Sequence, residues 1–199
     1  MSDKALIIFI KNPILGKVKT RLAKTVGEDE ALEVYYKLLE VTRNAAKRVD
    51  ATRHVYYSGF VDKNDQWSPI LFKKHKQNQS PDLGTRMTLA FESEFKNGAQ
   101  KVVIIGSDCP EISSDIIDRA FNFLESNDFV IGPTFDGGYY LLGMKAFSDE
   151  VFKNIEWSTS AVLTATLENI NNEQKSYTLL THLRDLDNED DLNELSNRL

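Results

Sequence analysis

Two kinds of hydrophobic pattern alternate along the chain. Residues 5–10 and 101–105 are short, nearly continuous apolar runs, which are typical of strands buried on both faces of a sheet. Residues 29–49 carry apolar side chains at a spacing close to i, i+3, i+4, i+7, which predicts an amphipathic helix. Similar patterns predict strands at 54–60, 70–74, 129–132, 139–143 and 176–180, and helices over 87–95, 116–124, 160–169 and from 188 onward. This alternation favours a mostly parallel sheet with helices on both faces.

A glycine-rich turn separates two of the predicted strands. Asp136-Gly137-Gly138 is a strong hairpin signal, so we expect a mixed sheet with a β-ribbon near 132–143. Because no linker rich in Pro, Gly or Ser interrupts the chain, residues 1–199 are expected to form a single three-layer α/β/α domain. Ligands of open α/β sheets bind beyond the carboxyl ends of the strands, which directs attention to the loops there.

The charge distribution limits the classes of partner. The formal net charge of −6 argues against a broad nucleic-acid surface. Between Lys4 and Glu28 there is no acid but several cations, which favours a small anionic ligand. Cys109 is the single cysteine and is expected to be a buried packing residue in a reducing compartment. The apolar run at 5–10 is too short for a signal peptide or a membrane span, so a cytoplasmic protein is expected.

The loop after the first strand is a candidate phosphate-binding segment. It contains Lys11, Gly16, Lys17, Lys19 and Arg21. The glycine would allow a close backbone approach, and in an extended loop the alternating cations would project to one side. Neither the P-loop pattern nor the dinucleotide fingerprint is present. The alternative is a solvated charged loop.

Asp108 directly follows the buried run at 101–105 and would stand at the same sheet edge. A carboxylate there could hold Mg²⁺ or Mn²⁺ bridging phosphate oxygens, and so act in catalysis. The alternative is that Asp108 caps the turn before the next helix. A complete Asp-x-Asp pair is missing at this position.

The glycine-rich turn is a candidate acceptor site. Asp136 could act as a second metal ligand or a general base, and Gly137, Gly138 and Tyr139 could line an acceptor pocket. A plain hairpin turn is the alternative, and both interpretations can hold together.

Two further segments can reach such a site. Gly84 and Arg86 open a predicted helix and would suit a phosphate or a base, although simple capping by Asp82 or Thr85 also explains this sequence. Asp185 and Asp187 could approach the same edge, but solvated acids are the ordinary interpretation of such a tail.

Four motifs in order resemble a known family. They are Lys11-x-Pro-x-x-Gly-x-Val-Lys-Thr-Arg-Leu22, Asp82-Leu-Gly-x-Arg-Met87, Gly106-Ser-Asp-Cys-Pro110 and Gly132-Pro-x-x-Asp-Gly-Gly-Tyr-Tyr-Leu-Leu-Gly143. Together they look like the bacterial rSAM/selenodomain-associated transferase 1 family, a glycosyltransferase branch of the nucleotide-diphospho-sugar transferases. The resemblance implies a Rossmann-like GT-A fold. It also implies that Lys17, Lys19 and Arg21 hold phosphates and that Asp108 stands in the place of the metal-binding acid.

The resemblance and the residues together lead to one main expectation and two alternatives. The main expectation is metal-dependent glycosyl transfer from a nucleotide-sugar to a small-molecule acceptor. The Lys-Thr-Arg-Leu element and residues 185–192 also resemble 2-phospholactate guanylyltransferases, so transfer of a nucleotidyl group to a phosphorylated small molecule is the first alternative. A non-catalytic nucleotide-binding protein is the second.

Overall fold

The structure is a computed structural model that describes residues 3–195 and 197, and seven strands within these residues form one sheet. In chain order the strands are β1 (Lys4–Ile10), β2 (Thr52–Tyr57), β3 (Lys73–Lys76), β4 (Lys101–Ile105), β5 (Phe129–Pro133), β6 (Tyr139–Met144) and β7 (Tyr177–Leu179). Their order across the sheet is β3-β2-β1-β4-β6-β5-β7. Only β6 runs antiparallel to its neighbours β4 and β5, so the sheet is mixed and mostly parallel, as expected.

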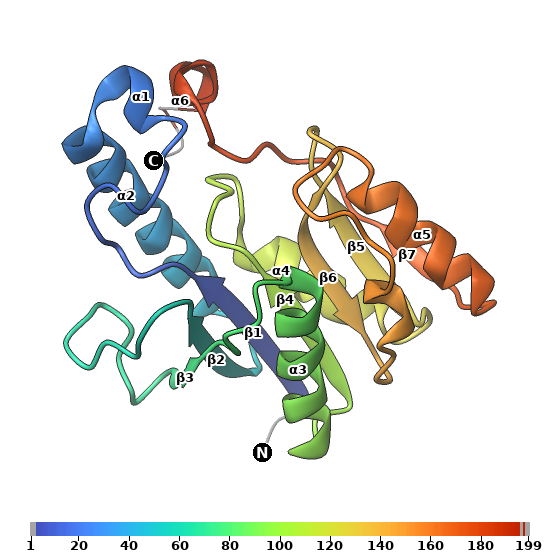
Figure 1. Cartoon of the computed structure of the whole chain (residues 1–199). Helices are drawn as coiled ribbons and strands as arrows, with labels where there is room; N and C mark the ends of the chain where they lie inside the picture. The colour runs from blue at the N-terminus through green and yellow to red at the C-terminus, as the bar shows by residue number, and fades with distance from the viewer. Residues whose placement is uncertain (1–2, 196, 198–199) are drawn as a thin grey trace.

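Helices cover both faces of this sheet (Figure 1). They are α1 (Ala23–Val26), α2 (Glu28–Ala46), α3 (Leu83–Lys96), α4 (Ser114–Phe123), the 3₁₀ turn η1 (Glu150–Phe152), α5 (Val162–Asn172) and α6 (Glu189–Leu195). Leu6, Ile8 and Ile10 of β1 pack into the core beside α2 and α4, whereas Ala5 and Ile7 pack into the core beside α3 and α5. The alternation of side chains along a strand therefore produces the predicted three layers.

The predicted hairpin forms within the main sheet. β5 and β6 pair antiparallel on either side of a turn at residues 134–138, and Gly137 in this turn has φ +91°. An L side chain rarely adopts that backbone conformation, which explains the glycine. The ribbon expected near 132–143 is thus the β5–β6 pair itself.

Two segments differ from the sequence pattern. The strand expected at 70–74 is displaced to β3, because Ile70 is 91% exposed in a turn and the strand itself is Lys-Lys-His-Lys. Lysines are common on edge strands, where they block further pairing, so hydrophobicity gives no signal there. The loop after β1 forms turns and the short α1 in place of an extended segment.

Each helix in the described part of the chain is too short or too polar to cross a bilayer.

Candidate functional site

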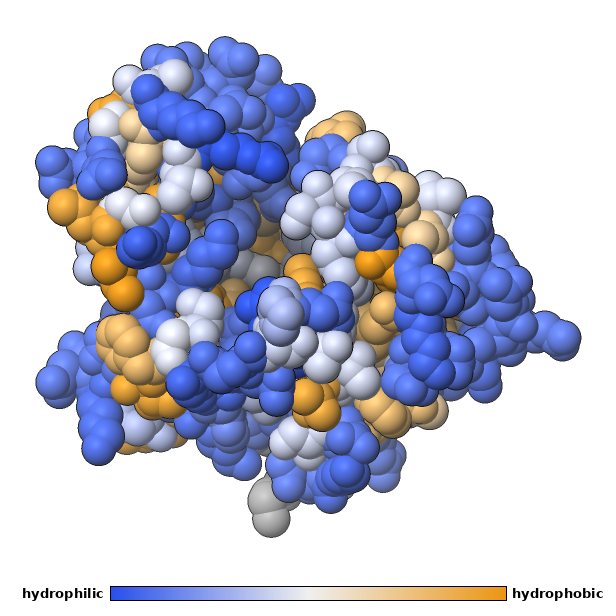
Figure 2. All heavy atoms as spheres, in the orientation of Figure 1, coloured by the Kyte–Doolittle hydropathy of each residue, from blue (hydrophilic) through white to orange (hydrophobic). Residues whose placement is uncertain are grey.

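A cavity of about 1100 Å³ lies at the edge of the sheet where β1 to β4 end. Lys11, Gly59, Gln77 and Asp108 line it from the segments that follow these four parallel strands. Since β6 runs the other way, its first residue, Tyr139, faces the same cavity. Figure 2 shows the surface hollowed in the middle of one face, with mostly hydrophilic residues around the rim. The site therefore lies at the edge that the topology predicts.

Lys19 and Asp108 form an ion pair inside this cavity. The Lys19 side chain is only 3% exposed, whereas 40% of the Asp108 side chain faces the opening. Burial would lower the pKa of Lys19, but Asp108 and its hydrogen bond outweigh this effect and raise the pKa. For Asp108, removal from bulk water would raise the pKa, and the charge of Lys19 reverses the shift, so the pKa is lowered. Both groups are therefore charged at neutral pH.

The segment at 185–187 meets the same ion pair. The backbone N–H of Leu186 donates to the carbonyl of Asp108 at 2.9 Å. The Lys19 ammonium in turn donates to the Leu186 carbonyl at 2.7 Å and reaches Oδ1 of Asp187 at 3.5 Å. Asp185 and Asp187 both line the cavity, so the structure brings these acids to the edge that Asp108 occupies.

Carboxylates outnumber the buried cation at this junction. Burial first, and then the charge of Asp108, raise the pKa of Asp185 to about 7, while Lys19 opposes the shift and Asp136 and Asp187 add to it. Burial makes the largest contribution to this shift, and the neighbouring carboxylates add to it because one buried ammonium offsets only part of their charge. The remaining negative charge is compatible with a further cation.

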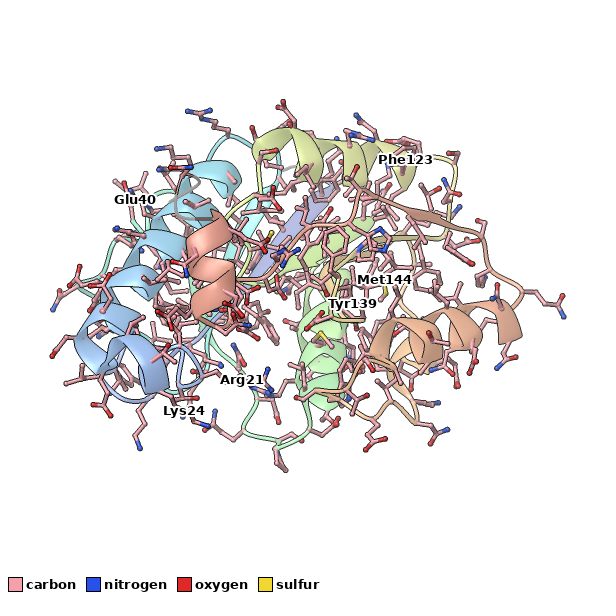
Figure 3. All side chains as sticks on the ribbon, turned by 90° about the horizontal axis from the view of Figure 1, so that it is seen from above. Arg21, Lys24, Glu40, Phe123, Tyr139 and Met144 are labelled. Carbon is pink, nitrogen blue, oxygen red and sulfur yellow. The ribbon has the colours of Figure 1, made fainter. Side chains whose placement is uncertain are left out.

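The cations of the loop after β1 line the same cavity as these acids. Lys11, Lys17 and Arg21 are exposed and line the cavity. Arg21 also forms an ion pair with Asp187, with 3.6 Å between Nη1 and Oδ2. Figure 3 shows Arg21 and Lys24 on the side of α1 and α2, and Tyr139 nearer the middle of the molecule. Lys17 and Arg21 thus remain exposed at the cavity although Arg21 pairs with Asp187, whereas the side chain of Lys19 is buried.

Arg86 enters the cavity from the first turn of α3. Its Nη1 donates to Oε1 of the buried Gln77 at 2.9 Å, and Gln77 is itself fixed by bonds to the carbonyls of Ile10 and Tyr56. Asp82 caps the helix by accepting from the backbone N–H of Thr85. The helix is capped by Asp82, as one of the two interpretations expects, and Arg86 is held by Gln77, a residue that sequence patterns did not single out.

Gly84 lies under an aromatic ring. A Cβ at Gly84 would meet the Trp157 indole at 2.9 Å, and the edge of this indole faces the ring of Tyr139, with 6.5 Å between ring centres. Trp157 and Tyr139 both line the cavity. Gly84 therefore provides room for the Trp157 indole, and Gly84 itself does not line the cavity.

The β5–β6 turn closes the cavity on the other side. Oδ1 of Asp136 accepts hydrogen bonds from Thr134 at 2.5 Å and from the backbone N–H of Gly138 at 3.1 Å, which stabilises the hairpin. Asp136, Gly138 and Tyr139 line the cavity. Gly137 packs instead against Ser160, whose carbonyl oxygen would lie 2.2 Å from an added Cβ. The turn is thus both a hairpin and part of the cavity wall.

The glycine and the cysteine of the two remaining motifs serve packing and turns. Gly16 has φ +71° and faces Glu28. Cys109 is buried, and its burial raises the pKa of the thiol to about 12. A thiol of this kind is unreactive, which confirms the packing role expected for it.

A second cluster of potential metal ligands lies away from the cavity. His54 Nδ1 lies 3.0 Å from both His75 Nε2 and Glu94 Oε1, and Tyr56 donates to Glu94 at 2.6 Å. The two imidazole ring centres are 5.2 Å apart, and the two nitrogens are 3.0 Å apart. The difference is close to the distance from ring centre to nitrogen counted once for each ring. The nitrogens therefore point directly at each other, as in an N–H···N hydrogen bond. A tetrahedral Zn²⁺ would need two nitrogen ligands about 3.3 Å apart, and the ligand atoms of His54, His75 and Glu94 all lie within 4.8 Å of one another, so the three residues form a candidate metal site.

Comparison with solved structures supports a nucleotide transferase fold. The chain is 34% identical to a "putative nucleotide-diphospho-sugar transferase" from Desulfovibrio desulfuricans G20, with a TM-score of 0.89 over 98% of this chain and 87% of that chain. The inositol-1-phosphate CTP transferase of T. maritima is 13% identical, with a TM-score of 0.60 over 99% and 94%. Rv0371c from Mycobacterium tuberculosis H37Rv, in a complex with manganese, is 11% identical, with a TM-score of 0.56 over 98% of both chains. The last two show the fold alone.

No match to the sequence is found among curated proteins. A family model described as "Uncharacterized protein conserved in bacteria (DUF2064)" matches residues 41–159, which is more than half of the chain. The chain therefore belongs to the DUF2064 family.

Proposed function

We propose that this protein is a metal-dependent transferase, which binds a nucleotide or nucleotide-sugar in the cavity and passes a group to a small acceptor. The observation that carries the proposal is that exposed cations and several carboxylates line one cavity at one end of the sheet. Lys17 and Arg21 line it together with Asp108, Asp185 and Asp187, and Arg21 pairs with Asp187. A nucleotide diphosphate with a divalent cation has the charges that such a cavity accepts.

The chemistry of the acids at this edge suits a hard divalent cation, although among the described residues only His54, His75 and Glu94 have their ligand atoms gathered within 4.8 Å of one another. Asp108, Asp185 and Asp187 offer carboxylate oxygens, which Mg²⁺ and Mn²⁺ prefer. Asp185-x-Asp187 supplies the paired acid that is missing next to Asp108. Burial first, and then the neighbouring carboxylates, raise the pKa of Asp185, and a divalent cation would offset the contribution of the carboxylates. When bound, such a cation would stabilise the charge that develops on a leaving diphosphate.

The chain's own side chains would position the nucleotide. Arg21 suits bidentate contact with phosphate, and Lys11 and Lys17 add point charges at the mouth of the cavity. Arg86, oriented by Gln77, would bind the nucleoside or a phosphate from the α3 side. Holding the reactants in one geometry and stabilising the charge that develops would account for most of the catalysis.

The β5–β6 side would hold the acceptor. Gly138 and Tyr139 line the cavity there, beside Trp157. Asp136 is our candidate general base, since Oδ1 is held by Thr134 and Gly138 while the residue stays exposed to the opening. Gly137 contributes by allowing close packing against Ser160.

Glycosyl transfer is the reaction we favour. The supporting observation is the 34% identity over nearly the whole chain to a protein named for nucleotide-diphospho-sugars. The four motifs point the same way, toward the rSAM/selenodomain-associated transferases 1 and a single domain over residues 1–199. Nucleotidyl transfer is the second candidate, favoured by three exposed cations at the cavity mouth, which are enough to hold a triphosphate.

Product analysis separates the two reactions. The protein would be incubated with nucleotide-sugars or with nucleoside triphosphates, with Mg²⁺ or Mn²⁺ and a panel of small acceptors. Release of a nucleoside diphosphate from a nucleotide-sugar supports glycosyl transfer. Release of inorganic diphosphate from a triphosphate supports nucleotidyl transfer. Binding without any turnover would contradict both.

A further inference from the structure

All three donors of the Lys19 ammonium are occupied. The group contacts Oδ1 of Asp108, the carbonyl of Leu186 at 2.7 Å and Oδ1 of Asp187 at 3.5 Å. The side chain is 3% exposed, and the backbone of Lys19 has φ +46°, a left-handed conformation that L side chains rarely adopt. Lys19 is thus held inward, and in this arrangement it has no N–H left for a phosphate.

The oxygens around Lys19 are of the kind that bind a divalent cation. Two belong to carboxylates and one is a backbone carbonyl, and this hard oxygen set is what Mg²⁺ and Mn²⁺ prefer. Asp108 and Asp187 are also the acids to which the proposed function assigns the metal. An ammonium and a divalent cation repel each other strongly at contact distance, so both cannot keep the same carboxylate oxygens.

We propose that Lys19 is a built-in competitor for the metal, which releases Asp108 and Asp187 only when a diphosphate arrives with the divalent cation. The inference rests on the proposed function and deepens it. Without a divalent cation, the ammonium pairs with Asp108 and Asp187 and offsets part of their negative charge. On loading, the divalent cation takes those carboxylates and the ammonium turns to the phosphate oxygens, which provide the acceptors that it loses. Lys19 is a positioning residue of the empty site and a phosphate contact of the loaded one.

This exchange makes metal binding depend on the phosphate ligand. A divalent cation alone must displace an ammonium that then has no acceptor, whereas a cation with diphosphate brings the replacement acceptors. The protein should therefore bind the divalent cation weakly in the absence of diphosphate. Diphosphate should raise the affinity of the protein for the cation, and this gain should exceed what the direct contact between cation and diphosphate contributes. If the charge at position 19 is removed, the affinity for the cation should depend much less on diphosphate.

The test measures Mn²⁺ binding by electron paramagnetic resonance, with inorganic diphosphate as the probe and no activity readout. The variants are Lys19→Gln, which removes the charge but keeps a donor, and Lys19→Arg, which keeps the charge. Lys24→Met is the matched control, since it removes a nearby exposed cation that forms no ion pair with the three acids among the described residues. Circular dichroism verifies folding, and Lys19→Met replaces Lys19→Gln if that variant does not fold.

Without diphosphate, we expect Lys19→Gln to bind Mn²⁺ about tenfold more tightly than wild type, because a neighbouring positive charge is gone. Lys19→Arg and Lys24→Met should resemble wild type. The gain in Mn²⁺ affinity on adding diphosphate should be about tenfold smaller in Lys19→Gln than in wild type. Unchanged or weaker Mn²⁺ binding by Lys19→Gln would overturn the inference, since it would make Lys19 merely a support for the carboxylates. Failure of wild type to bind Mn²⁺ even with diphosphate would instead overturn the proposed function.

Discussion

Arg21 and Asp187 come from opposite ends of the chain and form an ion pair at the mouth of the cavity, with 3.6 Å between Nη1 and Oδ2. Arg21 is 72% exposed. An exposed pair of this kind contributes only about 0–1 kcal/mol to stability. Its position therefore matters more for a ligand than for the fold.

Replacing Arg21 should separate these two roles. We expect Arg21→Ala to lower the affinity for nucleotides about tenfold, since it removes a bidentate phosphate contact. The melting temperature should stay close to that of wild type. Isothermal titration and thermal melting measure the two quantities, with Lys24→Ala as the control. Equal nucleotide affinities for Arg21→Ala and wild type would show that Arg21 does not touch the ligand.

A substitution at Gln77 should weaken binding through Arg86. In Gln77→Ala the Arg86 guanidinium loses its 2.9 Å partner and is no longer held toward the cavity. We expect nucleotide affinity to fall several-fold and the KM for the nucleotide to rise more than kcat falls. Gln79→Ala is the control, because the Gln79 side chain donates to the backbone carbonyls of Ser58 and Gln77 and not to Arg86. A fall in kcat at constant KM would contradict a role of Arg86 in binding the nucleotide.

Much of the fold follows from the sequence, because buried strands and amphipathic helices leave clear patterns. β1, β4 and α2 lie within a few residues of their predicted bounds, and the β5–β6 pair forms around the predicted turn. The sequence pattern places the third strand at 70–74 instead of at β3, because an edge strand made of lysines and a histidine has no hydrophobic pattern. Patterns of this kind report burial, so they fail where a strand is exposed.

The candidate site was less accessible to sequence reasoning, because side-chain direction depends on tertiary contacts. Lys17, Lys19 and Arg21 look equivalent in the sequence, yet a left-handed backbone and the 185–187 segment turn Lys19 inward. Asp185 and Asp187 resemble ordinary solvated acids until the chain returns them to Asp108. A signal was present in their i, i+2 spacing outside any helix.

The hairpin glycine gives a stability prediction with an internal control. Gly137 and Gly98 both have a left-handed φ, of +91° and +95°, but a Cβ would clash with Ser160 only at Gly137. Gly98→Ala should lower the free energy of unfolding by about 1–2 kcal/mol, because alanine is strained in this backbone conformation. Gly137→Ala should lower the free energy of unfolding by at least about 1–3 kcal/mol more than Gly98→Ala does, because the added Cβ would clash with Ser160. Denaturant unfolding measures both, and similar losses in the two variants would contradict the close packing of the turn against Ser160.

The crowding of carboxylates predicts a pH dependence in metal-free protein. The pKa of Asp185 is raised to about 7 in the fold from an ordinary value of 3.8, so the folded state holds a proton that the unfolded state releases. Stability should therefore fall as the pH rises from about 4 to about 7. In the presence of a chelator, Asp185→Asn should melt at a higher temperature than wild type at pH 8, with no gain at pH 4. The exposed Asp190→Asn is the control, and equal shifts of melting temperature for the two variants at pH 8 would contradict the raised pKa of Asp185.

The central claim is that cations and carboxylates at one end of the sheet together bind a nucleotide and a divalent metal. Isothermal titration of wild type and Asp108→Asn with nucleoside diphosphates, with and without Mn²⁺, tests it most directly. The account predicts that wild type binds at least one nucleoside diphosphate, about tenfold more tightly with Mn²⁺, and that Asp108→Asn loses this enhancement. Absence of binding by wild type, or the same Mn²⁺ enhancement in Asp108→Asn, would contradict it.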